Sequence, residues 1–261
     1  MRIVRFTPGP DAGLGQDPLF GILEDDATIS IISGDPIYSG IQKTAAKIEL
    51  NKVRLLAPVI PRSKVVCIGK NYADHAAEMG GVVPEEPIIF LKPNTSVIGP
   101  NDTIVWPEMS ERVDHEAELA IVIGRLCKDV PKERVNDVIF GYTIANDVTA
   151  RDLQKKDGQW TRAKSFDTFC PIGPWVDTDF IPGTQKITAT IAGEVKQSAQ
   201  ISDMIFDVPT IINFVSRVMT LLPGDIILTG TPAGIGPMVV GEKATMAIEG
   251  LGELTNKVAA Q

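Results

Sequence analysis

Short runs of apolar residues occur along the whole chain. They are separated by predicted turns that are rich in glycine, proline and acidic residues. Residues 1–34 contain three such runs, namely MRIVRF, LFGIL and TISII. The polar EDDA between the last two predicts a hairpin turn. Residues 41–56 predict a helical turn followed by an extended segment, KVRLLAP. The start of the chain is therefore predicted to consist mainly of strands.

A break in this pattern follows at Pro58 and Pro61, which mark a linker. We therefore predict a small N-terminal β-rich domain over residues 1–58. A larger, catalytic domain is predicted over residues 59–261, and the length of the chain allows both.

The larger part combines many apolar strands with few helices. The strands are expected at VVCIG, IIFLK, EAELAIVI, FGYTIANDVT, the hairpin KITATIAGEVKQSA, DIILTG and two short runs near the end. Short helices are expected at NYADHAAEMGG, PKERVNDV and ARDLQKKD. Because strands and helices do not alternate regularly, the pattern predicts a β-rich α+β fold.

One segment, DVPTIINFVSRVMTLL, has the periodicity of an amphipathic helix. Asp207 can cap its start, and Pro209 lies in its first turn. The apolar stripe is predicted to contain Ile212, Val215, Val218 and Met219.

Composition and charge argue against several classes of protein, namely those that bind nucleic acids, are secreted or span a membrane. The chain has 261 residues, 44% of them hydrophobic, and a net charge of -8 without a basic cluster, which argues against a nucleic-acid partner. The N-terminal MRIVRFTPGP lacks the apolar segment of a signal peptide, and no apolar stretch approaches the ~18 residues that span a bilayer. Three cysteines lie far apart and suggest neither disulfides nor zinc. We expect a cytoplasmic protein without a membrane partner.

Two glutamates, Glu116 and Glu118, stand at the start of an apolar strand and project to the same side of it. Asp147 ends another apolar strand and could complete an oxygen cluster. Such a cluster suits a hard cation, Mg²⁺ first and then Mn²⁺ or Ca²⁺. The alternative is that the three acids are solvated or paired with arginines at strand ends.

The two histidines differ in their surroundings. His75 lies three residues before Glu78 on a predicted helix, so the carboxylate can support the imidazole as a general base. A surface contact without a catalytic role is the alternative for this pair. His115 faces away from Glu116 by strand alternation, which favours a structural role.

A lysine and a glycine-rich loop add two further candidates. Lys164 lies among small and aromatic residues, and if buried it needs an anionic partner, either a functional one or a local acid such as Asp167. The loop TGTPAGIG lacks the lysine of a nucleotide-binding loop. It could offer Thr231 and backbone N–H groups to a small carboxylate.

Seven collinear stretches over residues 64–237 resemble the fumarylacetoacetate hydrolase family, in its branch of acylpyruvate hydrolases, oxaloacetate decarboxylases and 2-hydroxyhepta-2,4-diene-1,7-dioate isomerases. They are VVCIGKNYADHAAEMG, IIFLKPNTSVIG, DHEAELAIVIG, GYTIANDVTARDLQ, WTRAKSFDTFCPIGPWV, ISDMIFDVPTIINFVS and LLPGDIILTGTPAGIGP. The resemblance implies a mixed β-roll or sandwich core behind a small N-terminal β domain. It also implies a homodimer.

The resemblance assigns roles to individual residues. Metal ligands for Mg²⁺ or Mn²⁺ would be Glu116, Glu118 and Asp147. Residues around the substrate and its developing oxyanion would be Arg151, Gln154, Lys164 and Thr231, and His75 with Glu78 would activate water from a lid helix. The chain departs from some relatives at Asn71, where they carry a fourth acid, and at Lys70, where they carry an arginine.

The implied function is Mg²⁺-dependent hydrolysis of the C–C bond of a 3-acylpyruvate, a small 2-keto acid, together with decarboxylation of oxaloacetate. One alternative is an isomerase or decarboxylase that acts on 2-hydroxyhepta-2,4-diene-1,7-dioate in the breakdown of aromatic compounds. An alternative of another class is an inactive family member that serves as a binding protein.

Overall fold

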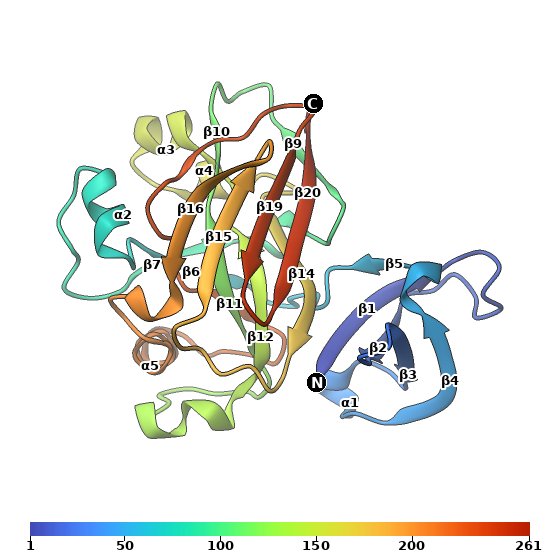
Figure 1. Ribbon diagram of the computed structural model, residues 1–261. Coiled ribbons are helices and arrows are strands. Elements are labelled where there is room, and N and C mark those ends of the chain that lie inside the picture. Colours follow the sequence, from blue (N-terminus) through green and yellow to red (C-terminus); the bar gives the residue numbers. More distant parts are fainter.

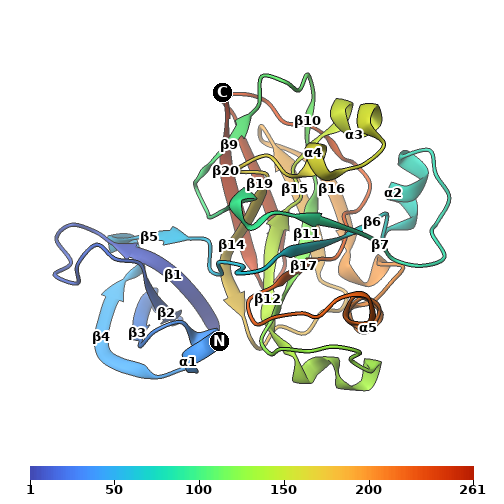
Figure 2. The ribbon, with the colours of Figure 1, turned by 180° about the vertical axis from the view of Figure 1, so that it is seen from behind.

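The computed structural model describes residues 1–261 and contains three sheets and five short α-helices (Figures 1 and 2). The strands are β1 (Arg2–Pro8), β2 (Leu19–Leu23), β3 (Thr28–Ile32), β4 (Lys43–Glu49), β5 (Val53–Leu56), β6 (Val65–Gly69), β7 (Ile88–Lys92), β8 (Val97–Ile98), β9 (Thr103–Trp106), β10 (Val113–His115), β11 (Ala117–Ile123), β12 (Ile139–Asn146), β13 (Thr149–Ala150), β14 (Cys170–Asp177), β15 (Lys186–Ile191), β16 (Glu194–Gln200), β17 (Ile226–Leu228), β18 (Gly236–Pro237), β19 (Lys243–Ile248) and β20 (Gly252–Ala260). The helices are α1 (Pro36–Ser39), α2 (Ala73–Glu78), α3 (Arg151–Asp157), α4 (Thr161–Lys164) and α5 (Val208–Val218), with 3₁₀ helices at Leu50–Lys52, Asn94–Ser96, Lys132–Asp137 and Ile201–Asp203.

Two of the sheets form the layers of the larger part. The first is a 12-stranded sheet, whose part in this region runs in the order β14-β12-β11-β17-β6-β7 and continues from β14 into β1. The second sheet has five strands in the order β16-β15-β19-β20-β9. The second sheet packs against β11 and β12, and apolar side chains from both layers form one core cluster of 36 buried residues. The predicted β-rich α+β fold with a layered core is confirmed.

Strand β11 at the centre of the first sheet is buried on both faces. Leu119 and Ile121 enter the large core, whereas Ala120 and Val122 enter a second cluster on the opposite face. This explains its unbroken apolar sequence, since neither face meets water. The same alternation places Glu118 on the face of Ala120.

Strands β1 to β5 form a separate lobe beside the larger part, with an apolar cluster of their own (Figures 1 and 2). The lobe is joined to the rest by pairing of β1 with β14 and by a hydrogen bond of 2.6 Å from the Tyr38 hydroxyl to the Pro223 carbonyl. Most of the segment 41–56 is β-strand, so the predicted helical turn before KVRLLAP is wrong except for the short 3₁₀ turn. Strand β4 completes the sheet by pairing with β3. The division of the chain into two domains stays a prediction.

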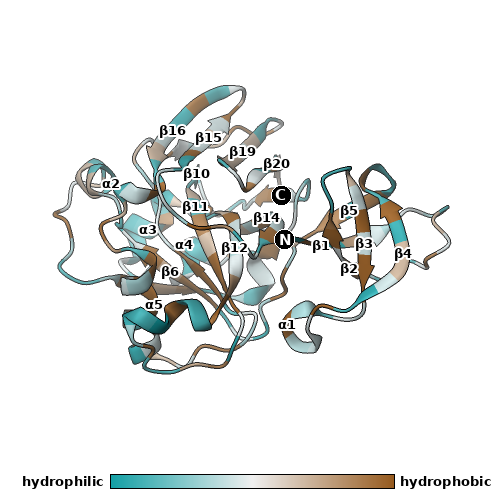
Figure 3. Cartoon of the chain, turned by 60° about the horizontal axis from the view of Figure 1, so that its bottom comes forward, coloured by the Kyte–Doolittle hydropathy of each residue, from teal (hydrophilic) through white to brown (hydrophobic).

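Helix α5 begins as predicted, because the Asp207 carboxylate accepts a hydrogen bond of 2.9 Å from the Thr210 N–H. Ile212 and Val215 are buried against the core, but Val218 is 57% exposed and does not belong to the apolar stripe. The helix ends there, so its last residue no longer faces the core. Figure 3 shows that α5 contains both polar and apolar residues. No helix in the structure is both long enough and apolar enough to cross a membrane.

Candidate metal centre and active site

Three buried carboxylates gather where β11 and β12 meet. Glu116 lies between β10 and β11, Glu118 lies on β11, and Asp147 follows β12. The pairing of β11 with β12 continues into a hydrogen bond of 2.9 Å from the Asp147 N–H to the Glu116 carbonyl, so sheet register sets the cluster. One oxygen from each acid lies within 4.8 Å of the others. The sequence prediction that Asp147 joins the two glutamates is confirmed in geometry.

Buried cations surround this cluster. The Lys164 Nζ lies 2.8 Å from Glu116 Oε2 and 2.6 Å from Asp147 Oδ2, so its partners are the cluster acids and not Asp167. The guanidinium of Arg151 pairs with Glu116 and, at 2.9 Å, with Asp114. Both cations are therefore held in place by charge-assisted hydrogen bonds.

Electrostatics separates the two glutamates. Burial alone would raise the pKa of Glu116, but the charges of Lys164 and Arg151 outweigh it and hold that pKa well below its usual range. Burial, together with the charges of Asp147 and Glu116, raises the pKa of Glu118 well above its usual range. Burial lowers the pKa of Lys164, but Asp147 and Glu116 overcome this and raise it, so the lysine stays protonated. Of the three acids of the cluster, only Glu118 forms no ion pair with a lysine or arginine.

The donor set of this cluster fits a divalent metal ion. The only hydrogen bond to the Glu118 carboxylate comes from the Gly230 N–H, at 2.7 Å. Glu116 and Asp147 are paired with the buried cations Lys92, Arg151 and Lys164, whereas Glu118 forms no ion pair. A buried carboxylate without a cation destabilises a protein unless a bound ion compensates its charge. Three carboxylates without histidine or cysteine ligands suit Mg²⁺ or Mn²⁺.

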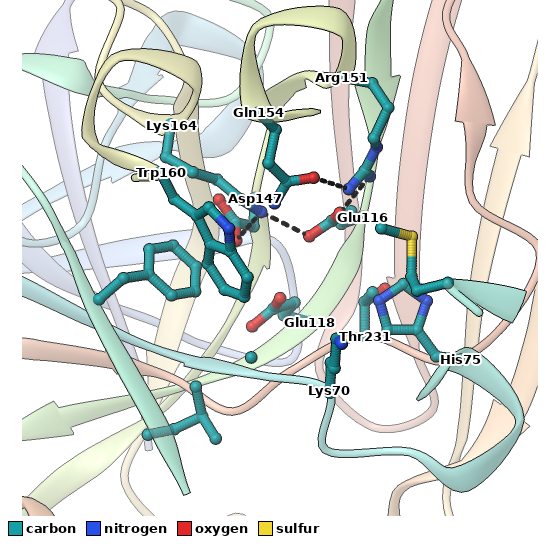
Figure 4. Close-up of a pocket in the computed structure, with 14 residues that line it drawn as sticks. Lys70, His75, Glu116, Glu118, Asp147, Arg151, Gln154, Trp160, Lys164 and Thr231 are labelled. Atoms are coloured by element: carbon teal, nitrogen blue, oxygen red, sulfur yellow. Dashed lines mark hydrogen bonds and ion pairs between the residues drawn. The ribbon is translucent and has the colours of Figure 1, made fainter. Parts of the chain in front are cut away.

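A pocket opens above the cluster (Figure 4). All the predicted site residues except Glu78 are among the residues that line it, namely Ile68, Gly69, Lys70, His75, Met79, Phe90, Glu116, Glu118, Asp147, Arg151, Gln154, Trp160, Lys164 and Thr231. Figure 4 shows Trp160 and Lys164 on one side of the acids, and Lys70 and His75 on the other. The rings of Phe90 and Trp160 pack edge to face, with 5.2 Å between their centroids, and both line the pocket.

His75 and Glu78 contact each other on α2, as their spacing predicts. The His75 Nδ1 lies 3.3 Å from Glu78 Oε2, while Nε2 makes no hydrogen bond to the protein. Glu78 lies outside the pocket and also accepts a hydrogen bond of 3.2 Å from the Gly234 N–H. The carboxylate therefore orients the imidazole and ties α2 to the glycine-rich loop.

Several polar groups of the pocket are already engaged with the protein. The Arg151 Nη1 donates to Gln154 Oε1 at 2.7 Å. The Thr231 hydroxyl donates to the Ala117 carbonyl at 2.8 Å and accepts a hydrogen bond from the Gln197 amide at the same distance. Two N–H groups of the glycine-rich loop, on Gly230 and Gly234, donate to protein carboxylates. Contact of the Thr231 hydroxyl or this loop with a substrate carboxylate stays a prediction.

Two buried residues that the sequence did not single out support the cluster. The Lys92 Nζ lies 2.5 Å from Asp147 Oδ1, on the side away from the pocket. Gln197 on β16 accepts a hydrogen bond of 2.9 Å from the Ala117 N–H and donates one of 2.7 Å to the Pro232 carbonyl. A lysine at the end of an apolar strand was a usable signal for Lys92. Gln197 gave none, because its strand is mostly exposed.

His115 and Asn71, two residues that the sequence analysis discussed, lie outside the pocket. His115 is buried and bonds to Gln197 through Nδ1 at 3.2 Å, which agrees with a structural role. Asn71 turns its side chain to the backbone of Phe206 and Thr229 and does not line the pocket. The cluster therefore contains three acids.

Comparisons with known proteins agree with this geometry. The family model "Fumarylacetoacetate (FAA) hydrolase C-terminal" matches residues 64–259, and the model "Rv2993c-like, N-terminal" matches residues 1–58. The chain is 44% identical to the mitochondrial oxaloacetate tautomerase Fahd2a of Rattus norvegicus, over 80% of this chain and 70% of that protein.

Solved structures extend the similarity to the whole chain. The 2-hydroxyhepta-2,4-diene-1,7-dioate isomerase from Mycobacterium marinum is 48% identical with a TM-score of 0.89, covering 100% of this chain and 99% of that one. The maleylpyruvate hydrolase from Sphingobium sp. SYK-6, in complex with manganese(II) and pyruvate, is 32% identical with a TM-score of 0.81 and the same coverage. The relatives therefore include a tautomerase, an isomerase and a hydrolase. The chain belongs to the fumarylacetoacetate hydrolase family.

Proposed function

We propose that the protein is a divalent-metal-dependent enzyme that hydrolyses the C–C bond of 3-acylpyruvates. The observation that carries the proposal is the position of His75, whose free Nε2 belongs to the same pocket as the acid cluster and Lys164. An imidazole held by a carboxylate suits the activation of water, and an ammonium among acids suits the stabilisation of an enolate.

Glu116, Glu118 and Asp147 would hold the ion, Mg²⁺ or Mn²⁺. When bound, the ion supplies Lewis-acid polarisation of the substrate's keto oxygen. Lys164 adds a fixed positive charge where negative charge develops as the C3–C4 bond breaks. Arg151 and Gln154, which are bonded to each other, orient the substrate from the α3 side.

The water-activating step follows from the dyad. The His75 Nε2 takes a proton from a water molecule, the hydroxide adds to the C4 carbonyl, and Glu78 stabilises the resulting imidazolium. Cleavage of the C3–C4 bond releases a carboxylic acid and the enolate of pyruvate, which then gains a proton at C3.

Keto–enol tautomerisation of oxaloacetate is the second candidate, and decarboxylation of the same acid would use the same groups. The observation that favours it is the similarity to an oxaloacetate tautomerase, together with a Lys164 that remains protonated. This reaction requires an enolate and a proton donor, but it requires no attacking water. Isomerisation of a hepta-diene dioate requires the same enolate and a proton shuttle.

A turnover screen tests the proposal. The purified protein is assayed with acetylpyruvate, fumarylpyruvate, oxaloacetate and 2-hydroxyhepta-2,4-diene-1,7-dioate, each with Mg²⁺, with Mn²⁺ and with a chelator. We expect C–C hydrolysis of the acylpyruvates that disappears with the chelator. Turnover of none of these acids with either metal would contradict the proposal and favour an inactive binding protein.

The substitution His75→Ala should separate hydrolysis from tautomerisation. Loss of the general base should lower the hydrolysis rate by roughly 10²–10⁴-fold, because no other unpaired imidazole reaches the pocket. Tautomerisation of oxaloacetate should fall much less, since it needs no hydroxide. Both rates are measured at saturating Mg²⁺. Equal losses in the two reactions would mean that His75 orders the substrate or α2, and the water-activating role would be abandoned.

A further inference from the structure

Lys70 occupies a distinctive position at the rim of the pocket. It directly follows β6, and its backbone has a φ of 56°, in the left-handed region that side chains other than glycine rarely adopt. Residues kept in such a conformation cluster at functional sites, because the surrounding structure must hold them there. The side chain lines the pocket on the side of His75 (Figure 4).

The Lys70 ammonium has no partner in the protein. The other two cations that line the pocket, Lys164 and Arg151, are both paired with carboxylates, whereas Lys70 forms no ion pair and no side-chain hydrogen bond. Gly81 leaves room for it, since a Cβ at that position would lie 2.7 Å from the Lys70 Nζ. The ammonium is therefore free to bind an anion that enters the pocket.

The positions of the charged groups indicate where such an anion would bind. A metal ion at the acid cluster would hold the 2-keto carboxylate of a substrate at the buried end of the pocket. Lys70 lies at the rim and is the one lining cation that no carboxylate of the protein neutralises, so a second carboxylate on the same substrate would bind there.

We propose that Lys70 binds the distal carboxylate of a dicarboxylic 2-keto acid and thereby selects such diacids over 2-keto monoacids. The assignment rests on the proposed function, because the 2-keto carboxylate must occupy the metal end of the pocket. A charge-assisted hydrogen bond is stronger than one between neutral groups, and a methyl group cannot form it. The diacid should therefore bind at least about tenfold more tightly than a matched monoacid.

Calorimetric titration of the Mg²⁺-loaded protein tests this assignment with unreactive ligands. 2-Oxoglutarate and 2-oxovalerate have equal numbers of carbon atoms and differ in a terminal carboxylate against a methyl group. The preference for 2-oxoglutarate should vanish in Lys70→Met, which keeps the length of the side chain, and should persist in Lys70→Arg. Lys155→Met removes an exposed lysine outside the pocket and should leave the preference unchanged.

Oxalate serves as the ligand that separates this inference from the proposed function. It is too short to extend from the acid cluster to the rim, so its affinity should be the same in the wild type and in Lys70→Met. A preference for the diacid that survives in Lys70→Met, or equal losses for both 2-keto acids, would overturn the role of Lys70. Absence of Mg²⁺-dependent oxalate binding in the wild type would overturn the proposed function and this inference with it.

Discussion

Lys164→Met should reduce turnover of every 2-keto acid substrate by at least about 10³-fold, since each proposed reaction passes through an enolate beside this ammonium. Mg²⁺ affinity should be retained or increased. The ammonium competes with the ion for the oxygens of Glu116 and Asp147, and methionine removes that competitor. Steady-state rates and calorimetric Mg²⁺ titration of the same preparations provide the two measurements.

Lys92→Met is the matched control for this result. Lys92 also donates to Asp147, at 2.5 Å, but it does not line the pocket. Its loss should therefore affect stability more than the turnover of bound substrate. If both variants lost activity equally, Lys164 would act only through Asp147, and its contact with the substrate would have to be abandoned.

Glu118→Gln should abolish stabilisation by Mg²⁺ and make the metal-free protein more stable at neutral pH. Burial and the charges of Asp147 and Glu116 raise the pKa of Glu118 in the folded protein above its unfolded value of about 4.3. The folded chain then binds more protons than the unfolded chain, so the free energy of unfolding falls as the pH rises through this window. The fall amounts to about 1.4 kcal/mol for each pH unit, and glutamine removes it.

Denaturant unfolding at mildly acidic and neutral pH, with a chelator and with Mg²⁺, measures this effect. Glu111→Gln replaces an exposed glutamate outside the pocket and should change neither the pH dependence nor the response to Mg²⁺. If Glu118→Gln were stabilised by Mg²⁺ as strongly as the wild type, Glu118 would not be a ligand.

Much of the fold could be predicted because local patterns decide it. The unbroken apolar run of β11 identified a strand buried on both faces, and Asp207 marked the start of α5. The segment that forms β4 could not be assigned, because its side chains are mostly exposed and its strand state depends on pairing with β3. Val218 was misplaced because periodicity does not show where the helix leaves the core.

For the candidate site too, local sequence patterns identified some of the residues and could not identify the contacts of others. The two glutamates could be grouped from strand alternation, and His75 with Glu78 from helical spacing. Sequence spacing could not identify the anions that pair with Lys164, since Glu116 is brought to it by the sheet from 48 residues away. The role of Lys92 depends on its contact with Asp147, and that of Lys70 on its unpaired position at the rim of the pocket, and only the folded chain provides this information.

Binding of Mn²⁺, followed by water-proton relaxation, tests most directly whether Glu116, Glu118 and Asp147 hold the ion at which a 2-keto acid binds. The wild type should bind one Mn²⁺ per chain, and added pyruvate should lower the relaxation enhancement by displacing water from the ion. Simultaneous replacement of the three acids by their amides should eliminate tight binding. Tight Mn²⁺ binding by that triple variant, or a wild-type signal that pyruvate leaves unchanged, would contradict the account.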